Sequence, residues 1–201
     1  ASLYKNMPVD NILQTNGATG ATMLALYALI EPDDHVISMY PTYQQLYDIP
    51  KSLGADVDLW EVEEDKGWLP DLDQLRRLIR PNTKMICINN ANNPTGALMD
   101  ATYLEELVAI AKEVDAYVFS DEVYRSFDQP APSIVDLYAK GIAVNSLSKT
   151  YSIPGIRVGW VASNTEVADI LRDYRDYTMI CAGVFDDMVA TLVLENKEAI
   201  L

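Results

Sequence analysis

Short apolar runs alternate with longer amphipathic stretches along most of the chain. Runs such as Lys84–Asn89 and Ala116–Asp121 are apolar over most of their length, which is typical of strands buried on both faces of a sheet. The stretch Ala101–Val114 instead repeats its apolar residues every three or four positions, as an amphipathic helix does. This alternation predicts successive βα units around a mostly parallel sheet.

The same pattern sets bounds for each expected element. Strands are predicted at His35–Met39, Val57–Val62, Lys84–Asn89, Ala116–Asp121, Ile142–Ser146 and Arg157–Ala162. Helices are predicted at Thr19–Ile30, Tyr43–Leu53, Leu72–Ile79, Ala101–Val114, Thr165–Tyr177 and Val184–Asn196. A chain of 201 residues, 49% of them hydrophobic, can bury a sizeable core, so we expect residues 1–201 to form one α/β domain.

The charge of the chain narrows its possible partners. Fifteen basic and 30 acidic residues give a formal net charge of −15. An acidic surface of this kind argues against a nucleic-acid backbone or an anionic membrane surface as partner. No apolar stretch of the sequence is long enough to span a bilayer, and residues 1–5 carry no signal-peptide pattern.

Cysteine and histidine usage excludes two further classes of site. Cys87 and Cys181 are far apart, and His35 is the sole histidine, so neither a disulfide framework nor a Cys/His metal cluster is indicated. A reducing cytoplasm fits this usage. A Ser-His-Asp triad would have to use His35, which lies where a turn enters a strand, and a structural role is the better interpretation.

Both ends of the sequence resemble cut ends. The chain begins with Ala1 rather than methionine, and the helical periodicity of Met188, Leu192 and Leu194 continues almost to the last residue, Leu201. We therefore expect this sequence to be a piece of a longer protein.

Polar residues gather where the predicted strands end, which is where ligands bind in open α/β sheets. The run Thr15–Ala21 opens the first helix with small residues, so its backbone N–H groups and the Thr19 hydroxyl can approach a phosphate. Taken alone, this run is equally consistent with a plain helix start.

Two loops supply groups that suit a planar ligand. Tyr43 follows Tyr40-Pro41-Thr42, and a rigid proline turn can hold its ring flat over an electron-poor heteroaromatic ring, although core packing is an equal alternative. Asn93 belongs to Asn89-Asn90-Ala91-Asn92-Asn93-Pro94-Thr95-Gly96, and its amide can donate to a phenolate-like oxygen.

The predicted strand Ala116–Asp121 ends in a carboxylate. Because a charge there is costly without a cation, Asp121 can hold a protonated ring nitrogen, while Tyr124 donates to a ring hydroxyl. The alternative is that Asp121 caps a helix.

Lys149 lies between two candidate anion ligands, Ser146 and Arg157. Ser146 and the Arg157 guanidinium can bind phosphate oxygens. Desolvation at the end of a buried strand and a nearby guanidinium both favour the neutral amine of Lys149, which is the form that makes an imine with an aldehyde. On Lys149 alone, a solvated lysine just past a strand end is the simpler interpretation. All these residues together describe one ligand, a planar cationic ring with a phenolic oxygen, a phosphate arm and an aldehyde, which is pyridoxal phosphate.

The chain resembles the large domain of the fold-type I pyridoxal-phosphate aminotransferases, the class I/II family that includes aspartate aminotransferase. The motifs that carry the resemblance are Asn93-Pro94-Thr95-Gly96, Asp121-Glu122-Val123-Tyr124, Ser146-Leu147-Ser148-Lys149-Thr150 and Pro154-Gly155-Ile156-Arg157-Val158-Gly159-Trp160. The resemblance covers nearly all of the chain. It implies a three-layer αβα sandwich with a mostly parallel central sheet.

The resemblance also implies a role for each site residue. Lys149 would carry the cofactor as an internal aldimine and move the proton between substrate Cα and cofactor C4′. Asp121 would pair with the pyridinium, Tyr124 and Asn93 would bond the phenolic oxygen, and Tyr43 would stack on the ring. The phosphate would be held by Ser146, Arg157, Ala18 and Thr19.

By the same resemblance the protein would be a homodimeric enzyme that moves an amino group between an amino acid and a 2-oxo acid. Members of the family usually bind the substrate carboxylate through an arginine in a C-terminal small domain, and an N-terminal segment helps to close the pocket. Neither part is found in residues 1–201. Two rival functions remain open: a β-eliminating lyase, or another pyridoxal-phosphate reaction such as cyclisation, that uses the same lysine, and a non-catalytic regulator that keeps the fold as an effector sensor.

Overall fold

The computed structural model describes residues 2–125 and 131–201 and contains one seven-stranded sheet. The strands follow the spatial order β1-β7-β6-β5-β4-β2-β3. Their bounds are β1 Ile12–Asn16, β2 His35–Tyr40, β3 Asp56–Glu61, β4 Thr83–Asn89, β5 Tyr117–Asp121, β6 Gly141–Ser146 and β7 Val158–Ala162. Strands β2 to β6 pair in parallel, whereas β7 runs antiparallel to both of its neighbours, β6 and β1.

Eight α-helices surround the sheet in the described part of the chain. Their bounds are α1 Gly17–Leu29, α2 Gln45–Ser52, α3 Leu72–Leu78, α4 Ala101–Glu113, α5 Ile134–Leu137, α6 Thr165–Arg175, α7 Val184–Glu195 and α8 Lys197–Ile200. Short 3₁₀ turns lie at Val9–Asn11, Glu64–Lys66 and Pro154–Ile156. None of the helices found in the described residues is both long and apolar enough to cross a membrane.

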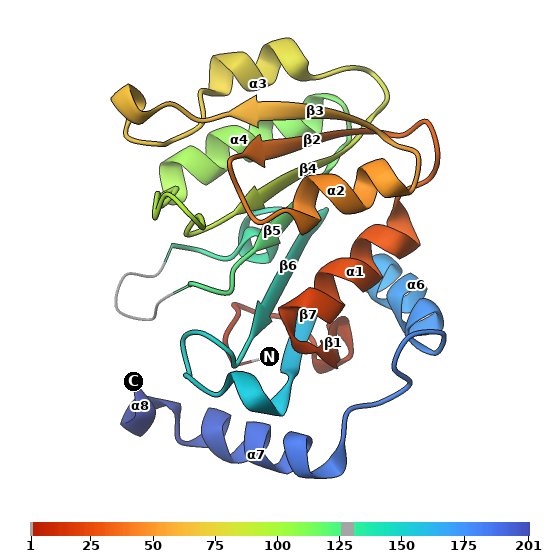
Figure 1. Cartoon of the computed structure of the whole chain (residues 1–201), viewed down its shortest axis with the longest axis vertical. Coiled ribbons are helices and arrows are strands. Elements are labelled where there is room, and N and C mark those ends of the chain that lie inside the picture. Colours follow the sequence, from red (N-terminus) through yellow and green to blue (C-terminus); the bar gives the residue numbers. More distant parts are fainter. Residues whose placement is uncertain (1, 126–130) are drawn as a thin grey trace.

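Helices α1 to α6 form two layers, one on each face of the sheet (Figure 1). Helices α1, α2 and α6 bury Leu24, Leu46 and Leu171 on the face that carries Phe119 and Val144. Helices α3, α4 and α5 cover the opposite face. There, Leu75, Leu104 and Ile134 pack against strand residues that alternate with those of the first core, such as Ile88 and Val118. The predicted three-layer α/β sandwich is therefore confirmed.

All six predicted strands and all six predicted helices are present, with ends that differ by a few residues. Strand β1 was not predicted from the sequence. It buries only Leu13 and Thr15 on one side, so its apolar pattern is weak, and its partner β7 lies far along the chain. The strand predicted at Arg157–Ala162 begins at Val158, because Arg157 has a φ of 50° in the left-handed region.

The predicted structural role of His35 fits its surroundings. The residue is fully buried at the start of β2, with Nδ1 2.8 Å from Thr83 Oγ1 and Nε2 3.1 Å from Asp58 Oδ2. Because the Asp58 carboxylate accepts from Nε2–H, Nδ1 of the neutral ring accepts from the Thr83 hydroxyl, whose oxygen also accepts the Arg80 N–H. His35 thus ties the beginnings of three neighbouring strands together.

The reversed direction of β7 decides what gathers at one edge of the sheet. Strands β4, β5 and β6 end there, at Asn89, Asp121 and Ser146. Because β7 runs the other way, it begins at this edge and brings Arg157 to it. The antiparallel pair β1 and β7 also places the first residue of α1, Gly17, beside the start of β7.

Two glycines allow this close approach. A Cβ on Gly159 would lie 2.4 Å from the Gly17 carbonyl carbon and 2.6 Å from the Ala18 nitrogen, far inside van der Waals contact. Gly17 has a φ of 70°, and a Cβ there would lie 2.5 Å from a guanidinium nitrogen of Arg157. Both positions therefore need the absence of a side chain, and together they fix α1 against β7.

Replacing Gly159 with Ala should lower the free energy of unfolding, because backbone atoms of α1 would have to move. We expect a loss of about 1 to 3 kcal/mol, as for other overpacked sites, measured by urea denaturation of the full-length protein. Gly155→Ala is the matched control, since a Cβ at Gly155 has no neighbour within 4 Å. Equal stability of the two variants would contradict the close approach.

Candidate active site

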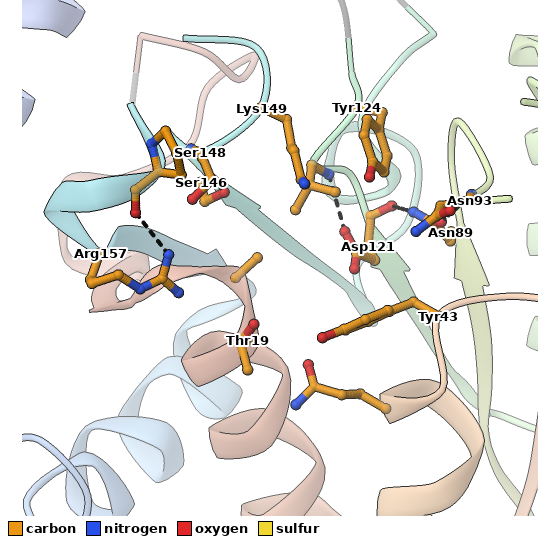
Figure 2. Close-up of a pocket in the computed structure, with 14 residues that line it drawn as sticks. Thr19, Tyr43, Asn89, Asn93, Asp121, Tyr124, Ser146, Ser148, Lys149 and Arg157 are labelled. Atoms are coloured by element: carbon orange, nitrogen blue, oxygen red, sulfur yellow. Dashed lines mark hydrogen bonds between the residues drawn. The ribbon is translucent and has the colours of Figure 1, made fainter. Parts of the chain in front are cut away.

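An open cavity of about 230 Å³ lies at the edge of the sheet where β4, β5 and β6 end. All nine residues that the sequence singled out line it, although they come from six separate segments of the chain. Figure 2 shows Arg157 and Thr19 at one end of the cavity and Asn93 and Tyr124 at the other. The lining residues are Ala18, Thr19, Tyr43, Gln45, Asn89, Asn93, Asp121, Val123, Tyr124, Ser146, Ser148, Lys149, Pro154 and Arg157.

One end of the cavity is cationic. The guanidinium of Arg157 lies against Gly17, at the first turn of the 13-residue helix α1, where free N–H groups and the helix dipole also favour an anion. Its NH1 donates to the Pro154 carbonyl at 3.0 Å, which orients the group. None of the ion pairs within residues 2–125 and 131–201 includes Arg157. Its charge is therefore available to a ligand.

Two serines lie at the same end. Ser146 is the last residue of β6 and is buried, and its Oγ accepts the Ser148 N–H at 3.3 Å. The Ser146 hydroxyl hydrogen therefore remains a donor toward the cavity. Ser148 also lines the cavity, but it was not singled out from the sequence.

The middle of the cavity holds a buried carboxylate. Asp121 is only 4% exposed at the end of β5, and one of its oxygens accepts the Val123 N–H at 3.1 Å. Burial raises the pKa of this carboxyl to about 6. No cation pairs with it among the described residues. The alternative role as a helix cap is wrong, because residues 122–125, which follow β5, form a turn and not a helix.

Asn89 arranges the opposite end of the cavity. Its Nδ2 donates to the Asp121 carbonyl at 2.9 Å, and its Oδ1 accepts the Asn93 N–H at 2.7 Å. Asn89 thus fixes the Asn93 loop relative to the end of β5. The exposed side chain of Asn93 is left free to face the cavity. Asn89 belongs to the run of four asparagines that the sequence indicated. Spacing alone did not show that Asn89 positions the loop while Asn93 faces the cavity.

Tyr43 and Lys149 lie on opposite sides of the space in front of Asp121 (Figure 2). Tyr43 is 40% exposed and lines the cavity, so the alternative of core packing is wrong. The amine of Lys149 lies 5.7 Å from the centre of the Tyr124 ring, close enough for a cation–π contact.

The predicted desolvation of Lys149 is wrong for this chain. Lys149 does not end the buried strand β6 but lies three residues beyond Ser146, in a turn, and its side chain is exposed toward the open cavity. Lys149 does line the same cavity as Ser146 and Arg157, as predicted.

Gln45 is a further lining residue that the sequence did not indicate. It is the first residue of α2, next to the Tyr43 turn, and its Oε1 is buried without a hydrogen-bond partner among the described residues. A single glutamine at a helix start gives no pattern that sequence analysis could use.

Comparison with known proteins places this site in a family. The family of class I and II aminotransferases matches residues 1–198. The chain belongs to the class I and II aminotransferase family. Members of this family depend on pyridoxal phosphate, and the fold is that of the aspartate aminotransferase large domain.

Individual relatives agree with this family. The chain is 33% identical to an aspartate aminotransferase of Thermotoga maritima over 198 residues, which is 95% of this chain and 52% of the relative. It is 28% identical to capreomycidine synthase of Streptomyces vinaceus, over 96% of this chain and 51% of that enzyme. A crystal structure of a PLP-dependent aminotransferase from Streptococcus suis 89-1591 superposes with a TM-score of 0.97 at 74% identity, over all of this chain and 54% of that one. The chain thus spans about half the length of these relatives.

The residues of the cavity fit pyridoxal phosphate. The unpaired guanidinium of Arg157, the start of α1 and the Ser146 hydroxyl suit a phosphate. The buried carboxylate of Asp121, with no cation of its own, suits a protonated ring nitrogen. The cavity is thus positive where it would meet the phosphate and negative where it would meet the protonated ring.

Asp121→Asn should stabilise the cofactor-free protein at alkaline pH. Folding raises the pKa of Asp121 from 3.8 to about 6, so the stabilisation from its bound proton is complete below 3.8 and is lost as the pH rises through about 6. The variant should therefore be more stable than the wild type by on the order of 3 kcal/mol at pH 8 and show little difference at pH 4.

Urea denaturation at both pH values measures this difference. The exposed residue Asp173 provides the control Asp173→Asn, which should not change stability in this pH-dependent way. A constant difference between Asp121→Asn and the wild type from pH 4 to 8 would contradict the burial of a lone carboxylate.

Proposed function

We propose that the full-length protein transfers an amino group between an amino acid and a 2-oxo acid by a ping-pong route. One observation carries this proposal: the amine of Lys149, the buried carboxylate of Asp121 and the unpaired guanidinium of Arg157 line a single cavity. Membership of the aminotransferase family supports it. When bound, pyridoxal phosphate would supply an aldehyde that takes up the amino group and a ring that withdraws electrons from the substrate carbon.

Four residues would hold the phosphate at the cationic end. Arg157 would pair with phosphate oxygens through its guanidinium, and the Ser146 hydroxyl would donate a further hydrogen bond. Ala18 and Thr19 lie in the first turn of α1, so their N–H groups have no partner within the helix and would donate to the same anion.

Four residues would orient the ring. Asp121 would accept a hydrogen bond from the ring nitrogen and keep that nitrogen protonated. Tyr124 and the Asn93 amide would donate to the phenolic oxygen, and Tyr43 would stack on one face. The exposed amine of Lys149 faces the cavity from the other side.

Lys149 would be the catalytic base. Its Nζ would bind the cofactor aldehyde in the resting enzyme and, once displaced by substrate, accept the proton that leaves the substrate Cα. The same amine would then return this proton during transfer of the amino group. A flexible exposed lysine next to Tyr124 can reach both positions.

The remaining assignments concern the whole protein. We infer a homodimer, supported by the apolar residues that α7 exposes, among them Phe185 at 84% and Met188 at 63% exposed. A reducing cytoplasmic location is supported by the two free thiols, Cys87 and Cys181. An arginine for the substrate carboxylate and the segment that closes the pocket would lie outside residues 1–201.

A β-eliminating lyase, or another reaction of the same cofactor, is the second candidate. It would use the same Lys149 and Asp121. Its support is that the matched relatives include capreomycidine synthase, whose name describes no amino-group transfer. A regulator that only binds the cofactor would use the same two residues, and membership of the aminotransferase family favours an enzyme over this alternative.

Lys149→Ala in the full-length protein should abolish the absorbance of the bound cofactor near the visible edge and the half-reaction with an amino acid. After borohydride reduction, mass spectrometry should find the cofactor attached to the wild-type protein and not to the variant. Lys51→Ala is the control, because Lys51 is an exposed lysine on α2 that does not line the cavity. Retention of both signals in Lys149→Ala would rule out this role.

Incubation of the wild-type holoenzyme with an amino acid separates the two candidate functions. Transamination should convert the bound cofactor to its aminated form, observed by absorbance, and should need a 2-oxo acid to restore it. With an amino acid that carries a leaving group on Cβ, release of that group together with ammonia and pyruvate, without any acceptor, would instead establish elimination.

A further inference from the structure

Glu122 is a buried carboxylate for which the proposed function has no role. It follows Asp121 directly, and its side chain is only 3% exposed. Its Oε1 accepts the Ser133 hydroxyl and the Ile134 N–H, both at 2.9 Å. Its Oε2 has no hydrogen-bond partner among the described residues, and the nearest cation is Arg125, 4.0 Å away.

The two neighbouring acids point to different places. Asp121 lines the cavity, whereas Glu122 reaches the start of α5, which lies under the opposite face of the sheet. The Glu122 N–H donates to the Val144 carbonyl of β6 at 2.8 Å, so its backbone continues the sheet. The side chain of Glu122 therefore anchors the turn behind Asp121 and not the cofactor cavity itself.

This turn, Glu122–Arg125, connects the parts of the candidate site. The Arg125 N–H donates to the Glu122 carbonyl at 2.9 Å, and Tyr124 lies inside the turn. The Thr150 hydroxyl donates to the Arg125 carbonyl at 3.3 Å, and Thr150 follows Lys149. A shift of this turn would therefore move both Tyr124 and the segment that carries Lys149.

Arg125 extends the same network. Its Nε donates to the Ala131 carbonyl at 3.1 Å and its NH1 to the Leu3 carbonyl at 3.2 Å. Its guanidinium lies 5.8 Å from the centre of the Tyr4 ring. A negative Glu122 holds this guanidinium by charge, since the distance of 4.0 Å is too long for a hydrogen bond.

We propose that Glu122 is a positioning residue for the cofactor site, whose carboxylate holds Tyr124 and the Lys149 segment in place through the turn Glu122–Arg125. This inference rests on the proposed function. It goes beyond a purely stabilising role, because a core residue of that kind would affect unfolding without affecting the cofactor.

The ionisation of Glu122 gives this inference a pH dependence. Burial raises the pKa of its carboxyl to about 7, with Asp136 adding to the rise and Arg125 opposing it. Tyr4 also lies close enough to interact with it. As the pH falls below about 7, Glu122 becomes neutral and its attraction for Arg125 is lost.

The test compares Glu122→Gln with the wild type in the full-length protein. The cofactor-free proteins are titrated with pyridoxal phosphate between pH 5.5 and 8, and the dissociation constant is taken from the absorbance. The amide oxygen of glutamine can still accept from Ser133 and Ile134, but its charge is gone. At pH 8 we expect binding about tenfold weaker in the variant, the size of effect for a lost contact to a charged group.

At pH 5.5 the two proteins should bind alike, because Glu122 is then neutral in both. The pH midpoint of the bound cofactor's absorbance should also shift in Glu122→Gln, since Tyr124 is expected to contact the phenolic oxygen. The exposed Glu105 provides the control Glu105→Gln, which should behave as the wild type. If Glu122→Gln and the wild type had the same affinity at pH 8 and the same pH midpoint, the inference would be overturned.

A second variant covers the case in which Glu122→Gln does not fold. Thr150→Val removes the hydroxyl that joins the turn to the Lys149 segment and leaves the core intact. It should shift the same absorbance midpoint, and no shift would count against the inference. A wild-type protein that binds no cofactor would contradict the proposed function as well, whereas normal binding with unaffected variants would remove only the role of Glu122.

Discussion

The structure of this site depends on a carboxylate that the protein buries without a cation. Asp121 ends β5, a strand with neighbours on both sides, and the Asn89 amide and the Asn90 N–H both donate to its carbonyl. The backbone therefore holds the carboxylate inside the molecule, where its charge is unfavourable. A ligand that brings a positive charge next to Asp121 would offset this unfavourable burial. The pyridoxal-phosphate dependence of the family agrees with this requirement.

The cationic end of the cavity presents the opposite situation. Arg157 is positively charged and lies against the start of α1, which carries a partial positive charge, and none of the ion pairs among the described residues includes Arg157. A ligand that is anionic at one end and cationic in its ring would balance the charges of Arg157 and Asp121 at once.

Most of the fold, and the gathering of all nine candidate residues around one cavity, could be predicted from the sequence, for identifiable physical reasons. Buried parallel strands and amphipathic helices leave strong periodic patterns, and polar groups at strand ends stand out against apolar runs. Strand β1 escaped prediction because it buries only Leu13 and Thr15 and pairs with a strand far along the chain. The exposure of Lys149 escaped prediction because burial of β6 does not extend through the turn that follows. Gln45 has a tertiary position that no local pattern reveals.

The reversal of β7 has a consequence for the kind of molecule that the site can accept. Lys149 and Arg157 both belong to the single connection between β6 and β7, whose ends are fixed by the pairing of Ser146 with Gly159. One covalent segment therefore limits how far apart the Lys149 amine and the Arg157 guanidinium can lie. In the proposed function, a ligand would therefore need a carbonyl and an anionic group far enough apart to reach Lys149 and Arg157 at the same time. An insertion or deletion there would change the reach of both groups together.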